Sequence, residues 1–181
     1  MFSLPKTIIT VDPGTAGLGI AVWDRVEWEV VYSLNIKQKR ELLQTLTPIK
    51  HFTKTFKEKE KYFHWFDELL ITYNCSIVYC EKPAYMGSSD KGQMVAESGR
   101  LVTLALHVGG LRAIAWTRAC SFHLIDVATW KGTLSKAIVQ ERILRVWPEC
   151  QAKSHDWDAI GIGMYLLGLI NNSKRKDFHH E

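Results

Sequence analysis

Residues 7–23 of this chain read TIITVDPGTAGLGIAVW, two apolar runs separated by a turn. The first run, 7–11, is rich in β-branched residues and predicts a buried strand that stops at Asp12-Pro13-Gly14. The second run, 17–23, predicts a neighbouring strand, and residues 26–34 predict a third after a short turn. The chain is therefore expected to open with a three-stranded meander.

Helical and strand-like segments alternate in the remainder of the chain. Helices are predicted over 37–47, 56–73, 95–117, 134–147 and 155–170. A further buried strand is predicted over 76–80, and a short strand over 122–126. This order predicts an α/β domain in which helices flank a mixed five-stranded sheet.

Length and composition are those of one ordinary globular domain. The chain has 181 residues, 46% of them apolar and 23% charged, and a net charge of +4, which excludes a disordered, collagen-like or coiled-coil protein. No apolar stretch reaches the roughly 18 residues of a membrane span, and the first residues do not resemble a signal peptide. We expect a soluble intracellular domain over 1–171 and a polar, flexible tail over 172–181. The four cysteines lack the spacing of a metal site and are expected to be buried or incidental thiols: Cys75, Cys80, Cys120 and Cys150.

Two of the predicted strands end in an acidic residue, Asp12 in the first and Glu81 in the fourth. In open α/β sheets, functional sites collect at the carboxyl ends of the strands. The charge of Glu81 follows an apolar run and would cost several kcal/mol unless it is solvated, paired or bound to a metal. Either acid taken alone is equally compatible with a turn cap.

A third polar element lies at the start of the last predicted helix. His155 and Asp158 are three residues apart and share one face, whereas Asp156 points elsewhere. Acidic residues in a first helical turn also complement the helix dipole. The glycine-containing apolar segment that follows, with Gly161 and Gly163, suits close packing on the sheet and would direct this first turn toward the strand ends. Carboxylates and an imidazole together suit Mg²⁺ or Mn²⁺.

Three motifs of the chain resemble those of the RuvC-type Holliday junction resolvases. They are DPGTAGLG at 12–19, VYCEKP at 78–83 and HDWDA at 155–159. The first is an Asp-Pro-Gly turn followed by a spaced glycine, and the second is an apolar strand that ends in Glu. The third is similar to the final acidic motif, whose earlier position is Asp or, in some members, His. Order and separation also match, over nearly all of residues 7–170.

The resemblance implies a ribonuclease-H-like fold with a metal site formed by Asp12, Glu81, His155 and Asp158. Magnesium is the implied ion, with manganese as a substitute. It also implies a homodimer that nicks two strands of a four-way DNA junction symmetrically, in recombination and repair. Because His155 stands where Asp is commoner, a different pH dependence is implied.

Two lysines fall where the family keeps basic residues near the scissile phosphate, Lys131 and Lys136. The resemblance implies that they stabilise charge on that phosphate. The alternative is that both are ordinary surface lysines around the start of a helix.

Other functions remain open on the same residues. The pattern Asp12-x-Gly14-Thr15-x-x-x-Gly19 also resembles the phosphate loop of the actin and sugar-kinase ATPases, although those proteins need two such domains around a cleft. A related metal nuclease acting on flaps or RNA–DNA hybrids would use the same acids. A non-catalytic junction-binding protein on the same fold is the third alternative.

Overall fold

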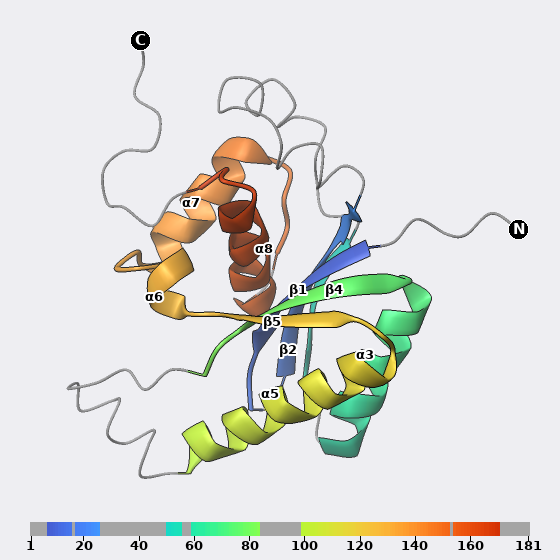
Figure 1. Ribbon diagram of the computed structural model, residues 1–181. Coiled ribbons are helices and arrows are strands. Elements are labelled where there is room, and N and C mark those ends of the chain that lie inside the picture. Colours follow the sequence, from blue (N-terminus) through green and yellow to red (C-terminus); the bar gives the residue numbers. More distant parts are fainter. Residues whose placement is uncertain are drawn as a thin grey trace, which may run out of the picture.

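The computed structural model describes residues 7–15, 17–25, 50–55, 59–83, 99–152 and 154–170, which form one mixed sheet with helices on both faces (Figure 1). The strands are β1 (Thr7–Pro13), β2 (Gly17–Asp24), β3 (Lys50–Thr55), β4 (Cys75–Glu81) and β5 (Ser121–Ile125). The helices are α3 (Lys59–Thr72), α5 (Arg100–Thr117), α6 (Val127–Trp130), α7 (Lys136–Val146) and α8 (Ser154–Leu166). The predicted α/β class with a five-stranded mixed sheet is confirmed. In these ranges no helix combines the length and apolar character that a membrane crossing needs.

The sheet has the order β3-β2-β1-β4-β5. β2 runs antiparallel to both of its neighbours, whereas β4 runs parallel to β1 and to β5. Val11 of β1 lies opposite Cys80 of β4. The next residues along these strands, Asp12 and Glu81, therefore emerge side by side at the same edge of the sheet.

Of the two strands that pair with β2, the one opposite β1 was not predicted from the sequence. It is β3, whose segment KHFTKT contains a single apolar residue and pairs with β2 from Gly17 opposite Thr55 to Val22 opposite Lys50. The strand predicted over 26–34 and the helix predicted over 37–47 lie outside the described residues, as does the tail after residue 170.

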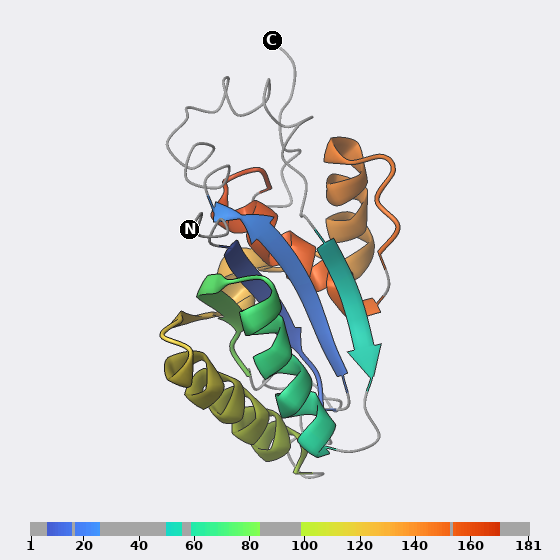
Figure 2. The ribbon, with the colours of Figure 1, turned by 90° about the vertical axis from the view of Figure 1, so that its right-hand side faces the viewer.

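Each face of the sheet is covered by its own apolar core, and Figure 2 shows the two helical layers on either side. On one face, α7 and α8 pack with the large buried side chains of Trp23, Trp130 and Ile160. On the other face, α3 and α5 pack with Phe66 and Leu111. The central strands β1 and β2 are thus buried on both faces, as their apolar sequences require.

Helix α8 lies unusually close to β1 and β2. The Thr10 hydroxyl donates a hydrogen bond to the Ala159 carbonyl oxygen (2.7 Å) and accepts one from the Trp23 indole nitrogen (3.0 Å). A Cβ atom on Gly163 would overlap the Trp23 indole, and one on Gly19 would overlap the backbone of His155. The close packing expected from the glycines of this helix is therefore present.

The close contact at Gly163 generates a stability prediction. Gly163→Ala is expected to lower the free energy of unfolding by about 1–3 kcal/mol, because the added methyl group forces Trp23 or α8 to move. Gly109→Ala is the matched control. Gly109 lies in α5 with open space around it, so this change is expected to raise stability by about 0.5–1 kcal/mol. Urea unfolding of both variants at one protein concentration tests the pair, and equal stability of the two would contradict the packing.

Candidate functional site

The site begins where the end of β1 meets the first turn of α8. The carboxylate of Asp12 is buried, and its Oδ2 lies 2.6 Å from Nδ1 of His155, a residue 143 positions further along the chain. The hydrogen bond to Asp12 raises the pKa of His155 against the opposing effect of burial. A raised histidine pKa favours the imidazolium, the form of His155 that pairs most strongly with the Asp12 carboxylate.

Glu81 extends from the end of β4 beside Asp12. Its Oε2 accepts a hydrogen bond from the Trp130 indole nitrogen (3.0 Å). Burial, followed by the negative charges of Asp12 and Asp158, raises the pKa of Glu81 to about 7, although the Trp130 hydrogen bond and the charge of Lys131 act in the opposite direction. Glu81 is thus a carboxylate whose ionisation the surrounding residues disfavour.

Asp158 lies on the same face of α8 as His155 and is paired with a lysine. Lys131 Nζ lies 2.8 Å from Asp158 Oδ1, and both side chains are largely buried. The charge of Lys136, at the start of α7, lowers the pKa of His155 and so acts on the same cluster. All of the residues predicted for the site are linked here by hydrogen bonds or direct electrostatic effects: Asp12, Glu81, Lys131, Lys136, His155 and Asp158.

Two further residues define what belongs to the site and what does not. Trp130 was given no role by the sequence analysis, yet its indole holds Glu81. The sequence feature that could have pointed to Trp130 is its position directly before Lys131, at the end of the short helix α6. Asp156 faces away from the site, as expected, and its Oδ2 lies 3.2 Å from Nδ1 of His51 on β3.

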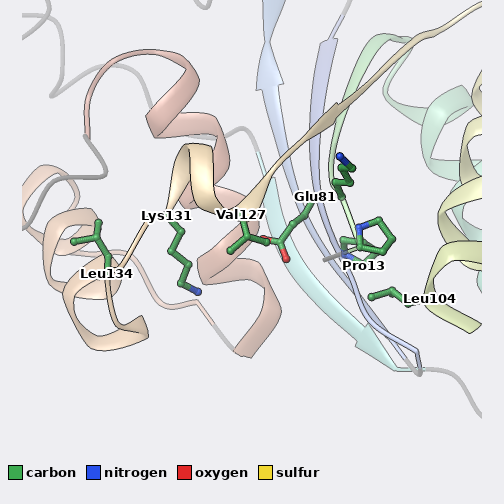
Figure 3. Close-up of a pocket in the computed structure, with 9 residues that line it drawn as sticks. Pro13, Glu81, Leu104, Val127, Lys131 and Leu134 are labelled. Atoms are coloured by element: carbon green, nitrogen blue, oxygen red, sulfur yellow. The ribbon is translucent and has the colours of Figure 1, made fainter. Parts of the chain in front are cut away.

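A hollow of about 320 Å³ opens beside the Glu81 carboxylate (Figure 3). Glu81 and Lys131 both line it, Lys82 and Leu104 contribute further wall, and Pro13 lies at the end of β1. Lys82 also pairs with Asp126 at the ends of β4 and β5 (3.0 Å). The hollow therefore brings two lysine side chains, each paired with an aspartate, next to Glu81.

The donor atoms of the site decide whether it can hold a divalent metal ion. Across the described residues, no three His, Cys, Asp or Glu side chains are arranged as a metal site. Asp12 is paired with His155, and Asp158 is paired with Lys131. The donor types nevertheless suit a hard cation. The repulsion between carboxylates that raises the pKa of Glu81 is what a divalent ion would relieve. The residues present thus fit such an ion once His155 no longer pairs with Asp12 and Lys131 no longer pairs with Asp158.

The architecture is that of the RuvC-type resolvase fold, within the ribonuclease-H-like class, as the sequence motifs predicted. No protein-family model and no curated protein sequence matches the chain. Among solved structures, it is similar to T. thermophilus RuvC in complex with a Holliday junction substrate, at 12% identity over 88% of this chain and 91% of that chain, with a TM-score of 0.58.

Two further structures show the same similarity. A second structure of Thermus thermophilus RuvC matches at 14% identity, over 88% of this chain and 92% of its own, with a TM-score of 0.56. The Fowlpox virus resolvase in complex with Holliday junction DNA matches at 11% identity, over 90% of this chain and 99% of its own, with a TM-score of 0.50. At these identities the similarity shows the fold.

The raised pKa of Glu81 generates a prediction for stability against pH. A carboxyl group whose pKa rises on folding destabilises the folded state as pH rises through the window from its ordinary value of 4.5 to about 7. In the presence of a chelator, Glu81→Gln is expected to remove this loss and to be more stable than the original chain above that window, by roughly 1–3 kcal/mol.

The measurement is urea unfolding of both proteins across the same pH range. Glu141→Gln is the control, because Glu141 is exposed on α7 in an ion pair with Arg145 and should leave the pH slope unchanged. A Glu81→Gln variant with the same pH slope as the original chain would contradict the assignment.

Proposed function

We propose that this chain is a metal-dependent endonuclease that resolves four-way DNA junctions by paired symmetric nicking. The observation that carries the proposal is the convergence of Asp12, Glu81, His155 and Asp158 on one edge of a sheet with the RuvC-type fold. Two of the structures similar to this chain hold Holliday junction DNA. Recombination and repair of DNA are the processes that such an activity would serve.

The proposed ligands of the divalent ions are Asp12, Glu81, His155 and Asp158. Magnesium is the proposed ion, and manganese should replace it. Two such ions, when bound, activate a water molecule and stabilise the leaving 3′-oxygen. His155 must give up its proton to act as a ligand, so binding is expected to strengthen as pH rises.

The chain's own side chains would bind and orient the scissile phosphate. Lys131 lies against both Asp158 and the hollow beside Glu81, so a metal at Asp158 would free its ammonium group for a phosphate oxygen. Lys136 acts on the same cluster from the start of α7. Trp130 holds the Glu81 carboxylate in place through its indole nitrogen. These donors would stabilise negative charge where it develops on the phosphate.

The alternatives differ in what they leave unexplained. A nucleotide-phosphate site of the ATPase type gives no role to Glu81 or to the first turn of α8. A non-catalytic junction-binding protein has no need of four side chains that are all competent metal ligands. A nuclease for flaps or RNA–DNA hybrids would use the same site, so only a comparison of substrates separates it from a resolvase.

The proposed enzyme is a homodimer, because a four-way junction presents two equivalent scissile phosphates. Helix α5 exposes an apolar face on which the side chains of Val102, Leu106 and Trp116 are 63%, 69% and 64% exposed. Their spacing of four and ten residues places them on one side of the helix. A large exposed apolar patch commonly marks an interface, so we assign this face to the second copy.

The direct test uses an immobile, fluorescently labelled four-way junction with Mg²⁺, beside duplex, flap and RNA–DNA hybrid substrates. Paired symmetric nicks on the junction alone, lost on addition of EDTA, are the expected result. Cleavage of flaps or hybrids instead would support the proposed metal site but contradict the four-way junction as the substrate. Tight junction binding without cleavage in any divalent ion would favour the non-catalytic alternative.

Asp12→Asn is expected to lower cleavage by about a thousandfold or more, because removal of a metal ligand costs several kcal/mol of transition-state stabilisation. Folding and junction binding should persist, because Asn keeps the shape of the side chain. Asp67→Asn provides the same chemical change in an ion pair with Arg118 on the opposite helical layer, and should cleave normally. Retention of Mg²⁺-dependent nicking by Asp12→Asn would refute the metal site.

Leu106→Asp is expected to convert the dimer to a monomer in sedimentation analysis and to replace paired nicking by slow single nicks. Ile71→Asp is the matched control, since Ile71 is 56% exposed on α3, and it should remain dimeric. A Leu106→Asp protein that still sediments as a dimer would place the interface elsewhere.

A further inference from the structure

A second cluster of polar side chains lies on the far side of the first turn of α8. It consists of His51 on β3, Cys150 in the segment after α7, and Asp156 on α8. His51 Nδ1 lies 3.2 Å from Asp156 Oδ2, and His51 Nε2 lies 3.9 Å from Cys150 Sγ. A carboxylate, an imidazole and a thiol are thus connected in series.

Of the three residues, Asp156 is buried, whereas His51 and Cys150 are both partly exposed. The Asp156 side chain is 3% exposed and the His51 side chain 23%. Cys150 is half-buried and is flanked in sequence by the exposed residues Glu149 and Gln151. The remaining cysteines, at 75, 80 and 120, are buried. Cys150 is therefore the thiol that a small molecule reaches most readily.

The imidazole between them is held in its charged form. Hydrogen bonds to Asp156 and to Cys150 raise the pKa of His51 to about 9, although burial acts in the opposite direction. Asp156 and Cys150 are the ionisable groups that act on it, one from α8 and one from the segment after α7. An imidazolium donates through both nitrogens, one to the carboxylate and one toward the sulfur. A cation beside a cysteine favours the thiolate, which is the nucleophilic form.

We propose that Cys150 is a covalent modification site, a nucleophilic thiol supported by His51 and Asp156, that reacts with small disulfides. The thiol proton leaves to solvent, and His51 remains protonated. The Cys150 sulfur then attacks one sulfur of the disulfide, a new S–S bond forms, the original S–S bond breaks, and the second half leaves as a thiolate. The disulfide is the oxidant and is reduced in the same step. His51 and Asp156 act as positioning residues.

The competing explanation is structural. The pair of His51 and Asp156 joins β3 to α8, and such a pair could serve only to hold these elements together, with Cys150 as an incidental neighbour. A purely structural role of the pair does not predict a fast reaction of Cys150. Thiol kinetics therefore separate the two explanations, and they do so without any measurement of DNA cleavage.

The experiment treats the full-length folded protein with dipyridyl disulfide and follows release of the coloured pyridinethione. One fast thiol per chain is expected, and peptide mass mapping should place it at Cys150. Cys150→Ser should lose the fast phase, whereas Cys120→Ser, which removes a buried thiol, should keep it.

His51→Gln supplies the decisive comparison. Near neutral pH its fast rate is expected to fall about tenfold, because an ordinary thiol is mostly protonated there. At alkaline pH, where any accessible thiol ionises unaided, the two rates should converge. A neutral-pH rate equal to that of the original chain would overturn the proposal, and so would a fast thiol that maps to another cysteine.

Loss of folding in His51→Gln would be recognised by circular dichroism, and Asp156→Asn then takes its place. Asn still accepts a hydrogen bond from the imidazole but no longer stabilises its charge, so a smaller fall in rate is expected at neutral pH. An unchanged rate in a folded Asp156→Asn protein would likewise overturn the proposal.

Discussion

The docking of α8 against β1 and β2 is the contact on which the rest of the molecule depends. It is made by the buried hydrogen bond from Thr10 to the Ala159 carbonyl and by the direct approach of Gly163 to Trp23. Buried polar groups must find partners, so Thr10 fixes the position of the helix along the strand as well as its distance. That position brings the first turn of α8 to the end of β1. A shift of α8 along the sheet would separate Asp12 from His155.

Around this contact the protein maintains a group of carboxylates that repel one another. Asp12 and Asp158 are compensated by His155 and Lys131, and Glu81 is left with a raised pKa and a hydrogen bond from Trp130. Such an arrangement costs stability, which the two apolar cores must offset. Costs of this kind are common at sites where charge is held ready for a ligand.

The sequence predicted those parts of the structure that depend on local pattern. β1, β2 and β4 are apolar runs and were predicted as strands. An acid that follows such a strand lies at the carboxyl end of the sheet, and for this reason Asp12 and Glu81 were predicted to belong to one site. β3 was not predicted, because its strand conformation depends on pairing with β2 and its segment carries one apolar residue. The hydrogen bond from Trp130 to Glu81 and the contact of His51 with Asp156 join distant parts of the chain, and no spacing in the sequence indicates either.

The separation of 143 residues between Asp12 and His155 has a consequence for synthesis of the protein on the ribosome. The strands that carry Asp12 and Glu81 are made early, but His155 and Asp158 are made after residue 154. A nascent chain can therefore assemble most of its sheet while its cluster of acids is still incomplete. Translation that stops before α8 yields a product that lacks His155 and Asp158, and also the Ala159 carbonyl to which Thr10 donates. The order of synthesis thus delays completion of the site until α8 has been made.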